Sequence, residues 1–163
     1  MKNFIFYIIL LFVAACGIYS FTGADYGNAK TVSIKYFDNI APVVNPNLSQ
    51  MFYDKLVDKF VSQSPLTLVP KDGDLQFQGQ ITGYDVKPVN IQAGETAANN
   101  RLTITVKVKF TNKTKPQDNF TKTFSWYADY PANKNLAEVE NELIDQITDK
   151  IVDDIFNAAV VNW

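Results

Sequence analysis

Residues 101–111 alternate between apolar and polar side chains, and this pattern constrains the fold more than any other feature of the sequence. The apolar positions are Leu102, Ile104, Val106, Val108 and Phe110. Because successive side chains of a β-strand point to opposite faces, these five share one face and the polar residues share the other. The segment therefore predicts a strand in a sheet that is covered on one side only.

Two amphipathic helices are predicted to cover that sheet. The first spans 45–63, with Asn45 as its cap and Pro46 in its first turn. The second follows Asn135, which forms a capping-box-like pair with Glu138. Each helix carries an apolar stripe: Leu48, Phe52, Tyr53, Leu56, Val57, Phe60 and Val61 on the first; Leu136, Val139, Leu143, Ile147, Ile151 and Ile155 on the second.

Further strands are predicted around the first helix and before the second. In the earliest, Val32, Ile34 and Tyr36 fall on one side. After residue 75, Gly79 and Gly83 interrupt the alternation, which indicates a bulge or a close approach of another backbone. The predicted segments are 31–37, a short piece at 66–69, 75–82 and 120–127.

The last strand is predicted to lie at a sheet edge. Phe120, Phe124 and Trp126 point inward, and Lys122 among them is a charge typical of edge strands. Connections are predicted at 88–100 and 112–119. The order β-α-β-β-β-α, plus the short strand, predicts a two-layer α/β (α+β) sandwich. We expect two helices packed on one face of a mainly antiparallel four-stranded sheet.

The N-terminus has the pattern of a lipoprotein export signal. Lys2 precedes the apolar run Phe4–Val13, which is shorter than the roughly 20 residues that span a bilayer. Val13-Ala14-Ala15-Cys16 then matches the lipoprotein cleavage and acylation pattern. A transmembrane anchor or an ordinary signal peptide is the alternative, but neither explains the position of Cys16.

This pattern predicts the domain organisation and the location. We expect a signal peptide at 1–15, a lipid-anchored tether at 16–29 and a single domain at 30–163. Cys16 would carry fatty-acid (palmitate) chains that hold the protein on a membrane. No acidic residue directly follows Cys16, which favours the periplasmic side of the outer membrane.

The composition removes most catalytic groups. The chain has no histidine, and Cys16 is its single cysteine. The usual general base, zinc ligand and thiol nucleophile are therefore missing. The net charge of −2 gives no global positive field for nucleic acid. We expect no enzyme activity, no catalytic residue, no metal site, no cofactor and no nucleic-acid partner.

Carboxylate pairs are the remaining catalytic option. Glu140 and Asp154 both fall within the apolar arc of the second helix. Their spacing places them about 21 Å apart along a straight helix, whereas glycosidases hold their carboxylates about 5–10 Å apart. A position at the edge of the stripe or a lysine partner is the simpler interpretation. Trp163 either packs against the helix base or marks a membrane interface.

Four stretches, taken in order, make the chain resemble the LptE family of lipoproteins, which assist lipopolysaccharide delivery to the outer membrane. None of them is a catalytic signature, so their order and the shared succession of elements carry the resemblance. The stretches are Cys16–Gly23; Tyr36–Ala41 running through Asn45–Gln50 into Asp58–Phe60; Asn100–Asn112; and Asp154–Trp163.

The resemblance implies a non-enzymatic protein that plugs the LptD β-barrel, helps it assemble and binds lipopolysaccharide. The polar strand face suits this, because a large barrel has a polar interior. Its candidate barrel contacts are Thr103, Thr105, Thr111, Thr121, Thr123, Ser125 and Tyr127. An ordinary solvated sheet face would have the same composition.

A cationic row on the same face is the candidate contact for the anionic lipid A region of lipopolysaccharide. It consists of Arg101, the only arginine, with Lys107 and Lys109. A planar guanidinium suits bidentate capture of phosphate. Solvent-exposed, solubilising lysines are the alternative interpretation of this row.

Two other functions are compatible with the sequence. A stand-alone periplasmic lipid- or glycan-binding lipoprotein predicts a deep apolar pocket. An envelope hydrolase predicts two carboxylates converging in a cleft.

Overall fold

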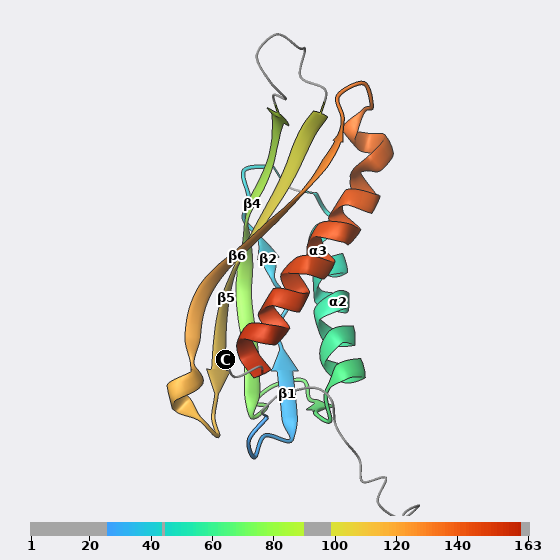
Figure 1. Cartoon of the computed structure of the whole chain (residues 1–163). Helices are drawn as coiled ribbons and strands as arrows, with labels where there is room; N and C mark the ends of the chain where they lie inside the picture. The colour runs from blue at the N-terminus through green and yellow to red at the C-terminus, as the bar shows by residue number, and fades with distance from the viewer. Residues whose placement is uncertain (1–25, 44, 90–98, 161–163) are drawn as a thin grey trace, which may run out of the picture.

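The structure, a computed structural model, describes residues 26–43, 45–89 and 99–160 as a two-layer α/β sandwich (Figure 1). Cys16, Trp163 and the centre of the predicted connection 88–100 lie outside these residues. The elements, in order, are β1 (Thr31–Ile34), β2 (Asp38–Asn39), α2 (Leu48–Gln63), β3 (Thr67–Leu68), β4 (Leu75–Val89), β5 (Asn99–Asn112), the 3-10 turn η1 (Pro116–Asp118), β6 (Phe120–Pro131) and α3 (Leu136–Val160).

The sheet confirms the predicted architecture but has more strands than four. Its order is β3-β1-β4-β5-β6, and β2 pairs with β4 beside β1. The long strands β4, β5 and β6 are antiparallel, whereas β1, β2 and β3 add short parallel pairings at one side. β3 lies within the short strand predicted at 66–69, whereas β2, which has only two residues, is too short for alternation to reveal it in the sequence. β6 lies at the edge, as the position of Lys122 predicts.

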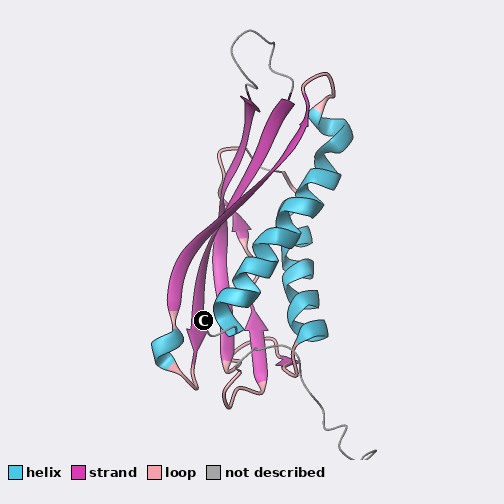
Figure 2. Ribbon diagram, in the orientation of Figure 1, coloured by secondary structure: helices cyan, strands magenta, loops and turns pink. Residues whose placement is uncertain are grey.

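Both helices cover one face of the sheet, as Figure 2 shows. α2 packs beside β1, β2 and β3, whereas α3 crosses β5 and β6. The predicted inward residues of β5, from Leu102 to Phe110, are at most 1 % exposed. Burying apolar side chains of this kind is the main favourable term in folding.

The first predicted strand, 31–37, ends early, and one of its side chains is reversed. β1 ends at Ile34, and the separate strand β2 follows at Asp38. Tyr36, predicted to be inward, is 49 % exposed, whereas Phe37 is fully buried. The chain turns here because the Phe37 ring packs over Gly79, which has no side chain in the way. The same ring contacts Phe52, with 5.0 Å between the ring centroids.

Both structural roles predicted for the glycines of β4 occur. At Gly79, the Phe37 ring approaches the backbone closely. Between Ile81 and Gly83, the register with β5 shifts, so that Thr82 is an additional residue. This bulge keeps both Ile81 and Tyr84 on the buried face.

The helix boundaries differ slightly from the sequence prediction. α2 begins at Leu48 rather than at Asn45, whose side chain instead accepts a 2.8 Å hydrogen bond from the Asn47 amide in the preceding turn. α3 follows Asn135 as predicted, and the Asn135 side chain accepts a hydrogen bond from the Ala137 amide.

Trp126, predicted to be inward, is 42 % exposed on the edge strand β6. In the described part of the chain, no helix is long and apolar enough to cross a membrane.

Candidate functional site

The polar sheet face predicted from the sequence is the face that neither helix covers. We call it the outer face. Cross-strand register brings its predicted members together, with Thr103 opposite Tyr127 and Thr105 opposite Ser125. The hydroxyls of Thr105 and Ser125 lie 3.0 Å apart. Thr121 and Thr123 are exposed on β6, and Thr111 extends the face beside β4.

Arg101 is on this face, but its charge is already paired. Its Nε and one terminal nitrogen donate to Asp129 at 2.7 and 2.9 Å. The guanidinium carbon lies 3.6 Å from the ring centroid of Tyr127. The hydrogen bonds from Arg101 hold the pKa of Asp129 below its usual range. This bidentate fork is the geometry that would otherwise hold a phosphate, so a ligand would have to displace Asp129.

Lys107 and Lys109 lie at a different part of the outer face. They border an open depression of about 490 Å³, which we call the cationic depression. Lys35, from the turn between β1 and β2, is the third cation there. All three are exposed, and no carboxylate of the described residues pairs with them. Its rim also includes Asp38, Gln78 and Gln80.

Lys35 is the member of this site that sequence reasoning missed. Alternation in 31–37 places Lys35 on the polar side, but a single strand does not reveal its neighbours. The register makes the connection: the Lys35 amide donates to the Phe77 carbonyl at 2.9 Å, and the next residue, Gln78, pairs with Lys109. Lys35 and Lys109 therefore lie on either side of β4.

A second surface hollow, of about 690 Å³, lies between the two helices and residues 126–128 of β6, and ion pairs between the helices border it. Lys55 contacts both Asp145, at 2.7 Å, and Asp149, and Lys59 contacts Asp153 at 2.7 Å. Hydrogen bonds to the two carboxylates raise the pKa of Lys55 against the opposing effect of burial. Asp145, Asp149 and Asp153 each face a lysine, which is not the arrangement of an acid and a base converging on a substrate.

The two carboxylates in the apolar arc of α3 have separate environments. Glu140 accepts a hydrogen bond from the buried hydroxyl of Tyr84 on β4. Burial, followed by this hydrogen bond, raises the pKa of Tyr84 above its usual value. Asp154 is exposed. In the ranges that the structure covers, no three acidic, histidine or cysteine side chains form a metal site.

The sequence model of LptE, described as lipopolysaccharide-assembly, matches residues 29–159. A search of curated proteins finds no match.

Three solved structures have the same fold at low sequence identity. A minor lipoprotein of Acinetobacter baumannii is 12 % identical, with a TM-score of 0.52 over 79 % of this chain and 91 % of that one. Protein CT253 of Chlamydia trachomatis is 10 % identical, with a TM-score of 0.54 over 82 % and 99 %. Lipoprotein B of Nitrosomonas europaea is 12 % identical, with a TM-score of 0.52 over 78 % and 80 %.

Proposed function

The chain belongs to the LptE family of lipopolysaccharide-assembly proteins, and from this premise we propose that it is a non-enzymatic outer-membrane lipoprotein that occupies the LptD barrel. In this role it helps the barrel assemble and assists lipopolysaccharide insertion. The uncovered outer face is the observation that carries the proposal. The helices pack on the other face, so the outer face is available to a partner.

The chemistry of the outer face matches a barrel interior. Threonine and serine hydroxyls both donate and accept, so they adapt to a polar wall without leaving a buried charge unpaired. The open depressions on the surface also suit a broad docking interface better than enclosure of a small ligand. The paired carboxylates between α2 and α3 provide no support for a hydrolase.

The cationic depression supports contact with lipopolysaccharide. Lys35, Lys107 and Lys109 present three ammonium groups to one hollow. A phosphate of lipid A would gain several charge-assisted hydrogen bonds there, which are stronger than neutral ones. Arg101 is not part of the proposed contact in this conformation, because Asp129 already occupies its fork.

Capture of LptD from membranes tests the docking face. Thr123→Trp and Ser125→Trp place bulk on exposed positions of β6 and should reduce LptD recovery at least about tenfold, the loss expected from roughly 1.4 kcal/mol of interface disruption. Gln146→Trp, exposed on α3, is the matched control and should retain capture. Equal loss in all three variants would contradict the assignment of the face. Wild-type protein that recovers no LptD would contradict the function itself.

A further inference from the structure

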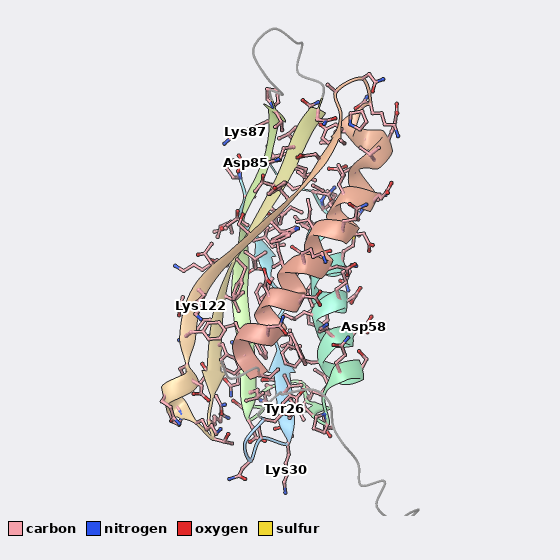
Figure 3. The ribbon with its side chains drawn as sticks, viewed as in Figure 1. Tyr26, Lys30, Asp58, Asp85, Lys87 and Lys122 are labelled. Atoms are coloured by element: carbon pink, nitrogen blue, oxygen red, sulfur yellow. The ribbon has the colours of Figure 1, made fainter. Side chains whose placement is uncertain are left out.

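The open hollow between the two helices and β6 has an aromatic side chain on one of its sides. Its volume lies within the range of small-molecule sites, about 300–1,000 Å³. α3 packs against both β6 and α2, so it forms the floor between them. Figure 3 shows this order of elements, with Asp58 labelled on α2. We call this site the helix hollow. The lining residues used below are Lys55, Asp58, Lys59, Trp126, Asp149, Lys150 and Asp153.

Trp126 forms the aromatic side of the helix hollow. It lies opposite the buried Ile104 in the β5–β6 register and is itself exposed. The Tyr127 ring is stacked with the Trp126 ring, with 6.4 Å between centroids and 19° between planes. Tyr127 is in turn covered by the guanidinium of Arg101, which Asp129 holds through two hydrogen bonds. The Trp126 ring is therefore held in place before a ligand arrives, which lowers the entropy cost of binding.

The charges that line the helix hollow cancel. Three lysines and three aspartates line it, so its formal net charge is zero. Lys55 contacts Asp149, and Lys59 contacts Asp153 at 2.7 Å. A carboxylate has about four lone-pair positions, so each of these aspartates can still accept hydrogen bonds from a ligand. A hollow with this balance has no excess of charge with which to attract an ion, but it offers many polar contacts.

We propose that the helix hollow binds a neutral oligosaccharide of hexopyranose units. A pyranose ring has a flat face of C–H groups that stacks on an aromatic ring, here that of Trp126. The hydroxyls around its edge both donate and accept hydrogen bonds. Asp149 and Asp153 can accept from them, and Lys150, which no carboxylate of the described residues pairs with, can donate. Because the hollow is open, a chain of several sugar units can pass across it.

Other classes of occupant match these residues less well. A nucleic acid could stack a base on Trp126, but its phosphates require an excess of cations beside the stacking surface. The centre of a protein interface is depleted of charged residues, whereas six charged side chains line this hollow. A lipid chain would remove water from the same charges without replacing its hydrogen bonds. The inference does not depend on docking to LptD, because the helix hollow and the outer face are different surfaces.

Isothermal titration of the full-length protein with maltohexaose and with cellohexaose tests the proposal. The detergent must have no sugar headgroup, so that it does not compete. We expect at least one of the two sugars to bind with a Kd below about 10 mM. Trp126→Ala should weaken binding at least about tenfold, because the stacking surface is lost. Trp126→Phe keeps an aromatic ring and should stay within about threefold of the wild type.

Tyr36→Ala is the matched control for Trp126→Ala. Tyr36 is also an exposed aromatic residue, but it lies outside the helix hollow, so its loss should not change the Kd. Lys150→Ala removes one hydrogen-bond donor and should weaken binding about threefold. Because the ligand is neutral, raising NaCl from about 50 to about 500 mM should change the Kd less than twofold.

Tryptophan fluorescence locates the bound sugar. The chain has two tryptophans, so Trp163→Phe leaves Trp126 as the only one. Its emission should change on addition of sugar and saturate with the Kd that titration gives. Heat of binding without any change in Trp126 emission would overturn the stacking contact.

The remaining outcomes also decide the proposal. Absence of binding by both sugars up to about 10 mM, or equal affinity in the wild type and Trp126→Ala, would overturn the sugar site. A deoxythymidine hexamer that binds more tightly than either sugar, with an affinity that falls with salt, would assign the hollow to nucleic acid instead. Loss of LptD capture in Trp126→Ala, without sugar binding, would assign Trp126 to a protein contact. Failure of the sugar site alone leaves the proposed function intact, because capture of LptD tests that function separately.

Discussion

The single residue Gly79 determines how the chain after β1 packs against the rest of the sheet. A Cβ added there would lie 2.5 Å from Cε1 of Phe37 and still closer to the carbonyl oxygen of Lys107. The Phe37 ring therefore takes the space that a side chain would need. Because Phe37 is fully buried, the turn that exposes Tyr36 and Lys35 depends on this absence of a side chain.

Gly79→Ala should destabilise the fold by about 3 kcal/mol or more, because the backbone of β5 cannot give way as a flexible side chain can. Gly83→Ala is the matched control on the same strand. Its Cβ would meet the side chain of Thr105 at 3.0 and 3.1 Å, so we expect a cost of about 1 kcal/mol. Urea unfolding of both variants measures the difference, and equal costs would contradict this explanation.

Tyr84 makes the free energy of unfolding depend on pH in the alkaline range. Burial and the hydrogen bond to Glu140 raise its pKa above 10.0, the value for an unperturbed tyrosine. In the pH range above 10.0 and below the raised pKa of the folded state, Tyr84 loses its proton in the unfolded chain but keeps it in the folded chain. The free energy of unfolding therefore falls as pH rises above 10.0, by up to about 1.4 kcal/mol per pH unit.

Tyr84→Phe removes both the pH-dependent contribution of the Tyr84 hydroxyl to stability and its hydrogen bond to Glu140. At neutral pH we expect a loss of about 1–2 kcal/mol. Above the usual tyrosine pKa, stability should fall less steeply in the variant than in the wild type. Urea titrations over a series of pH values compare the two slopes. The other tyrosines are common to both proteins, so identical slopes would mean that Tyr84 ionises normally in the folded chain.

Individual binding residues are less predictable than the face they share. Alternation places Arg101, Lys107 and Lys109 on one side of β5, and the structure keeps them there. Only the tertiary structure shows that Asp129 pairs with Arg101 and that Lys35 is a neighbour of Lys109. Both facts depend on cross-strand register, which a period of two along a single strand does not determine.

At the scale of elements, a row of phenylalanine rings connects both layers. Phe156 of α3, Phe60 of α2, Phe77 of β4, Phe110 of β5 and Phe120 of β6 follow one another with centroid distances of 4.7–5.1 Å. Both helices and the three long strands therefore contribute to one continuous part of the core. The stripe on the first helix predicts the burial of Phe60 correctly but also includes Val61, which is exposed. The contacts between elements require the fold.

Phe60→Ala should cost about 3–5 kcal/mol, because Phe60 joins the two helices to the sheet and its loss leaves a cavity. It is fully buried, whereas the adjacent Val61 is 53 % exposed. Val61→Ala is the control and should change stability by no more than about 0.5 kcal/mol. The free energies of unfolding from urea titrations test this comparison. A cost below about 1 kcal/mol for Phe60→Ala would mean that the ring row is not a shared core.

The long elements β5 and α3 were predictable in type and buried face, whereas the two-residue strand β2 was not, for a physical reason. Fourteen residues of β5 and twenty-five of α3 repeat their periods often enough to identify type and buried face. β2, with two residues, is held by pairing to β4 rather than by its own composition. β3 is as short, but it lies within the piece predicted at 66–69.

At the scale of the whole molecule, the two layers and the two ends have different roles. The helices close the core on one side and leave the outer face available on the other. Along its length, the molecule has Tyr26 and Lys30 at one end, and Asp85 and Lys87 towards the other (Figure 3). The end with Tyr26 is the one that a lipid on Cys16 would hold beside the membrane.

Acylation of Cys16 would fix the position of the whole molecule on a membrane. Ten residues separate Cys16 from Tyr26, and a fully extended chain of that length reaches at most about 36 Å. The anchor would thus keep the outer face within a limited distance of the bilayer. Cys16→Ser should abolish palmitate incorporation and shift the protein from the outer-membrane fraction to another fraction, whereas Ser20→Ala should change neither. Mass spectrometry that finds an unmodified thiol at Cys16 in cells would contradict the prediction. The barrel would then have to recruit the domain from solution, where no tether raises its local concentration.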